Sequence, residues 1–210
     1  MSGIYENKLK LIFDRIISGG LLLFLWPLLL IISVLIKLED GGRVLFTQYR
    51  LGKNRQIFKI YKFRTMKENH ENPQLRVFLG DNRITRVGAV LRKTSLDELP
   101  QLINILKGDM AIIGPRPILP EEVEAPKGEF PYERRFTCLP GLCCTVDIKY
   151  RAAADRELQF TMDVTYAENI RFWQDMLIAL RMVGAVIKGK NVYREEQADN
   201  RKKISSKKKL

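Results

Sequence analysis

The strongest constraint on this chain is an apolar stretch near its N-terminus. No charged residue occurs from position 16 to position 36. With a rise of 1.5 Å per residue, a helix over this stretch is about 30 Å long, enough to cross the hydrocarbon core of a bilayer. The stretch is too long for the apolar part of a signal peptide, and no small-x-small cleavage site follows it. We therefore expect residues 1–40 to be inserted in a membrane and retained in the mature protein.

The orientation of this segment is ambiguous from charge alone. Basic residues flank it on both sides: Lys8, Lys10 and Arg15 before it, and Lys37, Arg43 and Arg50 after it. The positive-inside comparison therefore gives no clear orientation, because both flanks carry the charge typical of a cytoplasmic side. Pro27, at the middle of the run, removes one backbone donor and favours a kink, as a re-entrant helix requires. A single-pass helix with a tolerated proline explains the same features.

The rest of the composition suits one domain beside the membrane segment. The chain has 210 residues and a formal net charge of +12. Six basic residues, and no acid, occupy the last ten positions: Arg201, Lys202, Lys203, Lys207, Lys208 and Lys209. Such a tail is either a solvated end or a contact for anionic lipid.

Few residues are available for nucleophilic or metal chemistry other than carboxylates. The spacing of Cys138, Cys143 and Cys144 matches no usual zinc or disulfide framework, so we interpret them as small buried hydrophobes in a reducing compartment. His70 is the only histidine and lies in a polar stretch, which argues against a Ser-His-Asp triad. Acid–base or nucleophilic work must therefore fall to Asp and Glu.

Two β-prone runs, 44–49 and 57–63, are separated by the turn-forming sequence LGKNRQ and predict a hairpin. Lys62 and Arg64 share one face of the second strand, and Phe63 points to the other. Such basic residues are usually solvated, but they also suit phosphate binding.

The segment TSLDELPQLINILKGDM predicts a helix that ends at Gly108. Ser95 would be its N-cap, and Glu98 three residues later would complete a capping box. Asp97 and Glu98 would then lie in the first turn, where negative charge stabilises a helix. That pattern alone favours a structural role for both acids.

Two further segments carry weaker signals. Arg116 stands between two prolines in GPRP, which hold it in an extended segment and make its guanidinium a suitable bidentate phosphate ligand. Residues 118–160 look irregular. Residues 165–188 have apolar residues at helical spacing and predict one long amphipathic helix, which either packs in the core or lies in the membrane interface.

Taken together, these motifs resemble the monotopic bacterial phosphoglycosyl transferases, also called bacterial sugar transferases. The likeness runs from about Phe13 to about Val192 and comprises five elements in order after the apolar segment: FTQYRLG, FKIYKFRTM, LRKTSLDELPQLINILKGDMAIIGPRP, Pro140-Gly141 and MDVTYAENIRFWQDMLIALRMV.

The resemblance implies a function. Such an enzyme moves a sugar-1-phosphate from a UDP-sugar to polyprenyl (undecaprenyl) phosphate and releases UMP, as the first membrane step of exopolysaccharide synthesis. It works on the cytoplasmic face of the bacterial inner membrane in contact with lipid. The chain then divides into a re-entrant membrane helix (1–40), a catalytic domain (41–192) and a basic tail (193–210), in an α+β fold with a small hairpin, several helices, amphipathic interfacial helices and little regular sheet.

The resemblance also implies site residues. Asp97 and Glu98 match the family's acidic dyad, in which the Asp is the nucleophile of a covalent phosphosugar intermediate and binds Mg²⁺. Arg92, Arg116 and Asp163 match other active-site positions, and we add Lys62, Arg64 and Arg151 as phosphate or substrate ligands. Pro27 matches the break of a re-entrant helix, so with the family in view we expect a re-entrant segment.

The chain departs from the family in one segment. Where relatives read PGITGWAQVNGR, it has PGLCCTVDIKYR, which keeps Arg151 but loses the glycines and the Trp-Ala-Gln. The sugar pocket must therefore differ here. Trp26 also precedes Pro27 where some relatives have Ser.

Two other functions account for part of the sequence. A non-enzymatic membrane-peripheral scaffold on anionic lipid explains the charge but gives LDELP and GPRP no role. Nucleic-acid binding has no groove-reading or stacking motif to support it, so we expect no nucleic acid. The sequence allows a homodimer and does not identify the sugar.

Overall fold

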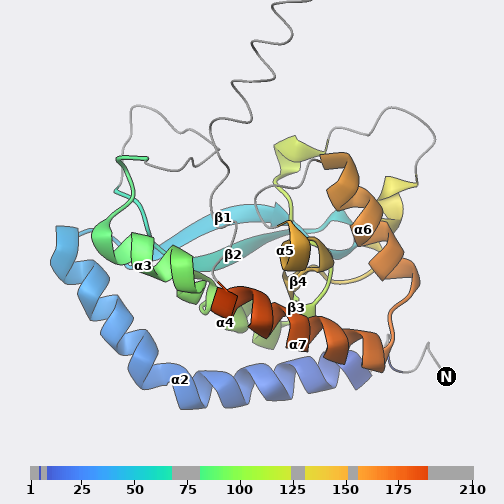
Figure 1. Cartoon of the computed structure of the whole chain (residues 1–210), viewed down its shortest axis with the longest axis horizontal. Coiled ribbons are helices and arrows are strands. Elements are labelled where there is room, and N and C mark those ends of the chain that lie inside the picture. Colours follow the sequence, from blue (N-terminus) through green and yellow to red (C-terminus); the bar gives the residue numbers. More distant parts are fainter. Residues whose placement is uncertain (1–4, 6–8, 68–80, 124–130, 151–155, 189–210) are drawn as a thin grey trace, which may run out of the picture.

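The computed structural model describes residue 5 and residues 9–67, 81–123, 131–150 and 156–188. The α-helices among these are α2 (Lys10–Asp40), α3 (Arg86–Thr94), α4 (Gln101–Lys107), α5 (Thr145–Lys149), α6 (Arg156–Glu168) and α7 (Phe172–Lys188). The strands are β1 (Leu45–Leu51), β2 (Ile57–Phe63), β3 (Ala111–Ile113) and β4 (Gly141–Cys143), and the 3₁₀ turns are η2 (Lys53–Arg55), η3 (Leu96–Glu98), η4 (Pro120–Glu122) and η5 (Tyr132–Phe136). The expected α+β fold with little sheet is confirmed (Figure 1). The basic tail, Arg151 and His70 lie outside the described residues.

The predicted hairpin is present. β1 and β2 pair antiparallel from Leu45–Phe63 to Leu51–Ile57, and β3 and β4 form a short parallel pair. Within the hairpin turn Asn54 adopts a positive φ of 54°, a conformation that asparagine tolerates better than most residues. Backbone hydrogen bonding from Leu51 N to Ile118 O, 2.9 Å, then holds the end of β1 beside the segment that follows GPRP.

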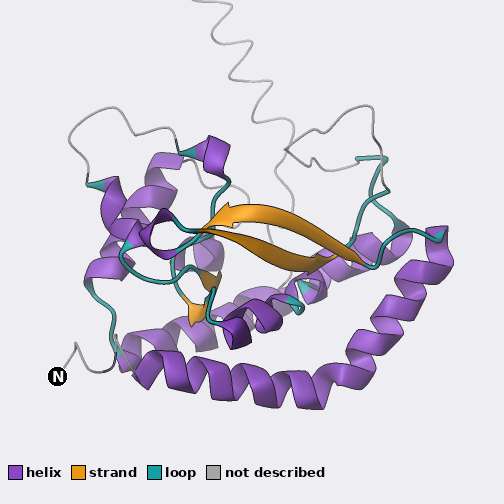
Figure 2. Ribbon diagram, turned by 180° about the vertical axis from the view of Figure 1, so that it is seen from behind, coloured by secondary structure: helices purple, strands orange, loops and turns teal. Residues whose placement is uncertain are grey.

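Helix α2 is the long apolar helix that the sequence predicts. It is the one helix among the described residues that is long and apolar enough to cross a membrane, with a mean hydropathy of 2.6 in its most apolar window. Figures 1 and 2 show that it bends sharply about half-way along and lies against one side of the molecule. Pro27 lies inside it and removes the donor that would close the bond to Leu23, which accounts for the bend.

Both arms of α2 pack on the rest of the fold. In the first arm Leu22 and Leu25 pack against the cluster around Ile105 in α4, and in the second Ile32 and Ile36 are buried against α3 and the end of β2. A straight spanning helix would carry one arm away from the domain. The bent shape therefore fits the re-entrant form.

Polar contacts tie both ends of α2 to the domain. Near the start, Lys10 Nζ lies 2.5 Å from Asp175 Oδ2 of α7. At the end, the Glu39 carboxylate accepts hydrogen bonds from the first two amides of α3, Arg86 N at 2.6 Å and Val87 N at 3.2 Å. Asp40 forms an ion pair with Arg64. The two ends are therefore held by the same domain.

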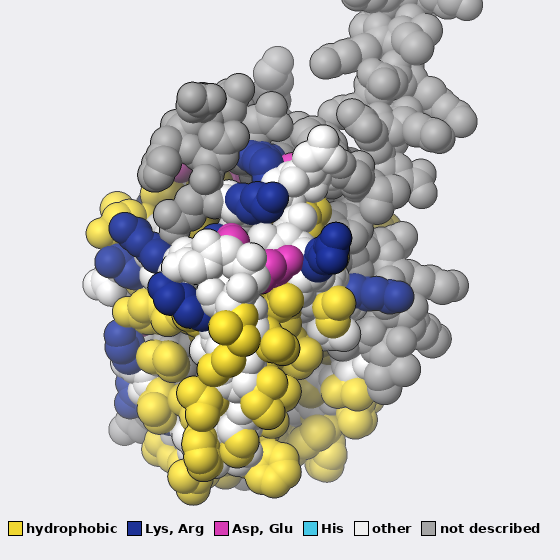
Figure 3. Space-filling model, turned by 90° about the vertical axis from the view of Figure 1, so that its left-hand side faces the viewer, with side chains coloured by type: hydrophobic (Ala, Val, Ile, Leu, Met, Phe, Trp, Pro, Cys, Tyr) yellow, Lys and Arg dark blue, Asp and Glu magenta, His cyan; other side chains and the backbone are white. Residues whose placement is uncertain are grey.

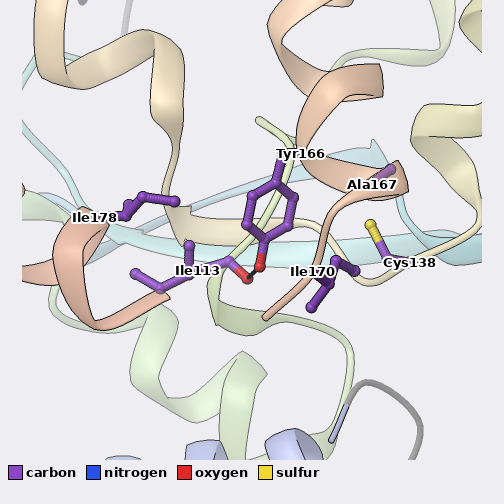
Figure 4. Packing of buried hydrophobic residues seen from close by; sticks show 6 residues of the cluster. All are labelled: Ile113, Cys138, Tyr166, Ala167, Ile170 and Ile178. Carbon is purple, nitrogen blue, oxygen red and sulfur yellow. Dashed lines mark hydrogen bonds between the residues drawn. The ribbon is translucent and has the colours of Figure 1, made fainter. Parts of the chain in front are cut away.

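A buried cluster links β3, α6 and α7 (Figure 4). Its members are Ile113, Cys138, Tyr166, Ala167, Ile170 and Ile178. The Tyr166 hydroxyl donates to the Ile113 carbonyl at 3.1 Å, so the one polar atom at its centre is satisfied. All three cysteines are free, and Cys138 and Cys144 are buried as expected.

Two sequence expectations are wrong in detail. The single helix over 165–188 is instead two, because the chain turns at Asn169, whose N–H bonds back to Tyr166 O, and buries Ile170 in the core. The segment 118–160 is more regular than its prolines indicate, because it includes η4, η5, β4 and α5 and reaches into α6.

The exposed faces of α2 and α7 are strongly apolar. Among the described residues the most exposed large hydrophobic side chains are Leu23, Phe24 and Leu38 of α2 and Trp173 of α7, each at least 75 % accessible. Figure 3 shows hydrophobic side chains covering the lower part of one face, with basic and acidic side chains above them. An apolar surface of this extent, bordered by charge, is typical of a membrane-binding face.

Candidate active site

The acidic pair lies on a short 3₁₀ turn between α3 and α4. Ser95 adopts a left-handed conformation (φ 59°), ends α3 and begins η3, which contains Asp97 and Glu98. The predicted capping box is wrong, since the Ser95 side chain caps no amide of this turn. An N-cap residue usually has an extended backbone, which Ser95 lacks. Pro100 is instead the N-cap of a separate helix, α4, which begins at Gln101. Asp97 and Glu98 therefore lie in the short turn η3 before α4, and not in the first turn of the predicted helix.

The two carboxyl groups have different surroundings. Lys62 of β2 places Nζ 2.6 Å from Glu98 Oε1. Burial, assisted by the neighbouring Glu98 charge, raises the pKa of Asp97 to about 6, while Lys62 and Arg92 act in the opposite direction. Glu98 is therefore held by a cation, whereas burial disfavours the charged form of Asp97.

Arg92 is positioned by the close contact of α3 with the end of β2. Its Nε donates to Thr65 Oγ1 at 2.7 Å. The backbones approach so closely at Gly88 that an added Cβ would lie 2.1 Å from the Thr65 carbonyl oxygen, so only glycine fits there. This contact brings the Arg92 charge near Asp97, where it partly opposes the rise in the Asp97 pKa that burial causes.

Arg116 is held through its side chain and its backbone. Its Nη1 donates to both carboxylate oxygens of Asp147 in α5, at 2.8 and 2.7 Å. Its N–H donates to Asp163 Oδ1 at 3.3 Å, and its carbonyl accepts from Arg135 Nη2 at 2.7 Å. The Nε and Nη2 groups remain as further donors on a side chain that is 43 % exposed.

Asp163 acts from beneath this segment. It is 0 % exposed and pairs with Arg135 Nη2 at 2.5 Å. Burial raises the pKa of Asp163 to about 6, although the Arg135 charge and hydrogen bond act to lower it. Its contacts make it a support for the Arg116 backbone. Sequence reasoning missed Arg135 and Asp147, although Asp147 lies in PGLCCTVDIKYR, the segment that supplied Arg151 as a candidate ligand.

A small open hollow lies where these elements meet. Its lining residues are Arg50, Ile60, Lys62, Glu98, Gln101, Arg116, Pro117, Gly141, Leu142 and Cys144. The fold thus brings together Lys62, Glu98 and Arg116, which are far apart in sequence, with Asp97 adjoining Glu98. Arg50 was also missed, although its presence in FTQYRLG was a signal that could have found it.

Comparison with known proteins decides the family. The family model described as bacterial sugar transferase matches residues 5–189. The chain belongs to the bacterial sugar transferase family.

Named relatives of this sugar transferase share much of its sequence. It is similar to a UDP-N-acetylgalactosamine-undecaprenyl-phosphate N-acetylgalactosaminephosphotransferase of Aeromonas hydrophila, at 41 % identity over 78 % of this chain and 40 % of the relative. It is also similar to the exopolysaccharide production protein ExoY of Rhizobium meliloti, at 36 % identity over 86 % of each chain. A UDP-glucose:undecaprenyl-phosphate glucose-1-phosphate transferase of Caulobacter vibrioides is 34 % identical over 88 % of this chain and 72 % of the relative. These relatives favour the enzyme over the scaffold.

Within this sugar transferase, Arg64 is not among the residues that line the hollow. Its guanidinium forms an ion pair with Asp40, with Nη1 2.7 Å from Oδ2, and so fastens β2 to the end of α2. That ion pair gives Arg64 a structural role.

The acidic turn of the sugar transferase fits Mg²⁺ only together with a phosphate ligand. The described residues include no group of three or more His, Cys, Asp or Glu side chains able to hold a metal. Mg²⁺ prefers oxygen ligands and is commonly held by one or two carboxylates plus substrate phosphates and water. The Asp97 carboxylate meets that requirement.

Proposed function

We propose that this protein transfers a sugar-1-phosphate from a UDP-sugar to polyprenyl phosphate and releases UMP, at the cytoplasmic face of the bacterial inner membrane. The observation that carries the proposal is the position of the Asp97–Glu98 turn. It adjoins a basic hollow suited to a charged donor, while its neighbouring helix α4 packs on the apolar α2. A water-soluble donor and a lipid acceptor can therefore reach one carboxylate. The acceptor and donor classes follow the names of the relatives.

The first step would form a covalent intermediate. An Asp97 carboxylate oxygen attacks the phosphorus bonded to the sugar oxygen, the bond to the bridging diphosphate oxygen breaks, and UMP leaves with that bonding pair. A carboxylate is a weak nucleophile toward an anionic diphosphate, so the donor charge must be neutralised. Arg116 and Arg92 provide positive charge from this chain, and bound Mg²⁺, held by Asp97 and donor phosphates, would supply further neutralisation.

The second step would regenerate the enzyme. A phosphate oxygen of the polyprenyl phosphate attacks the same phosphorus, and the Asp97 carboxylate departs. The product is a polyprenyl diphosphate sugar. Glu98, paired with Lys62, is placed to assist this exchange electrostatically or to accept a proton.

The re-entrant form of α2 supports the proposed location. Both arms pack on one domain and both ends make ion pairs with it, so in a bilayer the two ends would lie on the same side. The apolar outer faces of α2 and α7 would then lie among lipid tails.

The test is UMP release by the purified full chain in detergent or lipid nanodiscs, with UDP-sugars, polyprenyl phosphate and Mg²⁺. We expect wild-type turnover and none above background for Asp97→Asn, which removes the nucleophile but keeps nearly the same shape. Glu157→Gln, an exposed change on α6, is the matched control and should behave as wild type. Substantial turnover by a folded Asp97→Asn variant would refute the covalent route.

A further inference from the structure

The cations that line the hollow are not equally neutralised. Lys62 faces Glu98 at 2.6 Å, and Arg116 faces Asp147 at 2.7 Å. Each of these two positive charges is therefore matched by a carboxylate at hydrogen-bond distance. Arg50, the third cation of the lining, is not matched in this way.

Arg50 is surrounded mainly by neutral partners. Its Nη2 donates to Gln48 Oε1 at 2.8 Å and its Nη1 approaches the Pro117 carbonyl at 3.4 Å, while Nε has no hydrogen-bond partner among the described residues. The carboxylate paired with it, Glu122, is 3.8 Å away, beyond hydrogen-bond distance. That carboxylate also binds Arg156 at 2.9 Å, so its charge is shared.

The Arg50 charge is also partly desolvated. Its side chain is only 21 % exposed. Burial lowers the pKa of the Arg50 guanidinium to about 10; Glu122 opposes the shift and the nearby Arg116 adds to it. A half-buried cation beside a second guanidinium is costly unless an anion compensates it.

The position of Arg50 is set by the fold. It lies in β1 immediately before Leu51, whose N–H bonds to Ile118 O two residues beyond Arg116. The hairpin therefore delivers Arg50 to the same hollow as Arg116. An anion between the two guanidinium groups would relieve their repulsion and supply the missing acceptors.

We propose that Arg50 is an anion-binding residue of this hollow and that, with Arg116, it takes a diphosphate group. The identity of that diphosphate as part of the sugar donor rests on the proposed function, but the anion site itself does not. A diphosphate offers several negative oxygens over a span that two guanidinium groups can share.

The experiment uses inorganic pyrophosphate as the probe, because it needs no knowledge of the sugar or the base. The full chain in nanodiscs is titrated with pyrophosphate by calorimetry at constant ionic strength, as wild type, Arg50→Gln, Arg50→Lys and Arg134→Gln. Arg134 is the matched control, because it is exposed, pairs with Glu168 and is absent from the hollow lining.

We expect pyrophosphate to bind Arg50→Gln at least about tenfold more weakly than wild type, as the loss of charge-assisted hydrogen bonds implies, and Arg134→Gln to match wild type. Equal binding by wild type and Arg50→Gln, or no binding by wild type, would overturn the inference. If Arg50→Gln loses its thermal unfolding transition, Arg50→Lys decides. A weakening of about threefold or more supports a guanidinium contact, and unchanged binding excludes it.

UMP release by the same preparations separates this inference from the proposed function. If the wild-type protein binds pyrophosphate through Arg50 but releases no UMP, the anion site is supported and the transferase proposal is refuted. If the protein releases UMP but its pyrophosphate binding does not depend on Arg50, the transferase proposal is supported and the anion site is refuted.

Discussion

Lys62 Nζ lies 2.6 Å from Glu98 Oε1, so a residue of strand β2 holds one member of the acidic pair in the turn before α4. Sequence reasoning placed Lys62 on phosphate. The structure also gives it a carboxylate partner, Glu98, at the edge of the hollow. From this position Lys62 can pair with Glu98 and also contact a bound phosphate. The pair also fixes the hairpin relative to the turn that contains Asp97.

This contact predicts coupled effects of Lys62 and Glu98 on turnover. We expect Lys62→Met and Glu98→Gln each to lower UMP release by about 10- to 1,000-fold, because each removes a charge beside the reacting phosphate. The double variant should lose much less than the product of the two single losses, since both disrupt the same ion pair. Steady-state rates of the three variants, with melting temperatures, are the measurement. Fully multiplicative losses would show that the two residues act separately.

The raised pKa of Asp97, about 6, predicts how the donor half-reaction depends on pH. The carboxylate must be ionised to attack, so the UMP burst should rise between pH 4 and 7, with an apparent pKa of about 6 or lower because Mg²⁺ on the carboxylate favours its ionised form. Acceptor must be left out of this measurement, because a phosphate monoester titrates in the same range. A burst that is flat from pH 4 to 7 would contradict ionisation of Asp97 as the controlling step.

The same shift predicts that Asp97→Asn stabilises the fold at neutral pH. The folded-state pKa is raised, so Asp97 binds its proton more tightly in the fold, and its contribution to stability falls as pH rises from about 4 to about 6. Above pH 6 the variant should gain about 1–2 kcal/mol, or a few degrees in apparent Tm, after allowance for partial solvation. Thermal unfolding at pH 7.5 and at pH 4 tests this, and the gain should vanish at the lower pH.

Arg116 is expected to act through donor geometry as well as charge. Its Nη1 is engaged by Asp147, which leaves Nε and Nη2 to meet phosphate. A lysine has only one ammonium group, and contact with Asp147 would draw it from the substrate. We therefore expect Arg116→Lys to be nearly as damaging as Arg116→Ala, at about 30- to 1,000-fold in UMP release, or roughly 2 to 4 kcal/mol. A loss of less than about threefold for the lysine variant would remove Arg116 from the phosphate site as described.

The bend of α2 predicts that both of its flanks face the cytoplasm. Cysteines introduced at Ser2 and at Lys53, an exposed turn residue, should react with a membrane-impermeant maleimide in inverted vesicles and stay protected in right-side-out ones. Pro27→Ala should weaken this arrangement by restoring a backbone donor and straightening the helix. Labelling of the two positions from opposite sides would establish a spanning helix instead.

Local sequence patterns were enough to predict several elements. An uncharged run from 16 to 36 can only be a helix when it meets lipid, since no water is present to satisfy its backbone groups. Alternation and a turn signal likewise predicted the β1–β2 hairpin, and the family motifs made Asp97 and Glu98 the candidate catalytic acids. These features depend on neighbours along the chain or on a short motif, so they can be read without coordinates.

Tertiary structure decided which residues share the site. The ion pair of Arg64 with Asp40, the pairing of Arg116 with Asp147, and the arrival of Arg50 in the hollow all join segments that are well separated in sequence. The helix predicted from Ser95 became a 3₁₀ turn and a separate helix because the left-handed backbone at Ser95 and the proline at position 100 interrupt it. Local propensity describes what a segment can form alone, whereas burial and charge pairing select its final conformation only after distant segments meet.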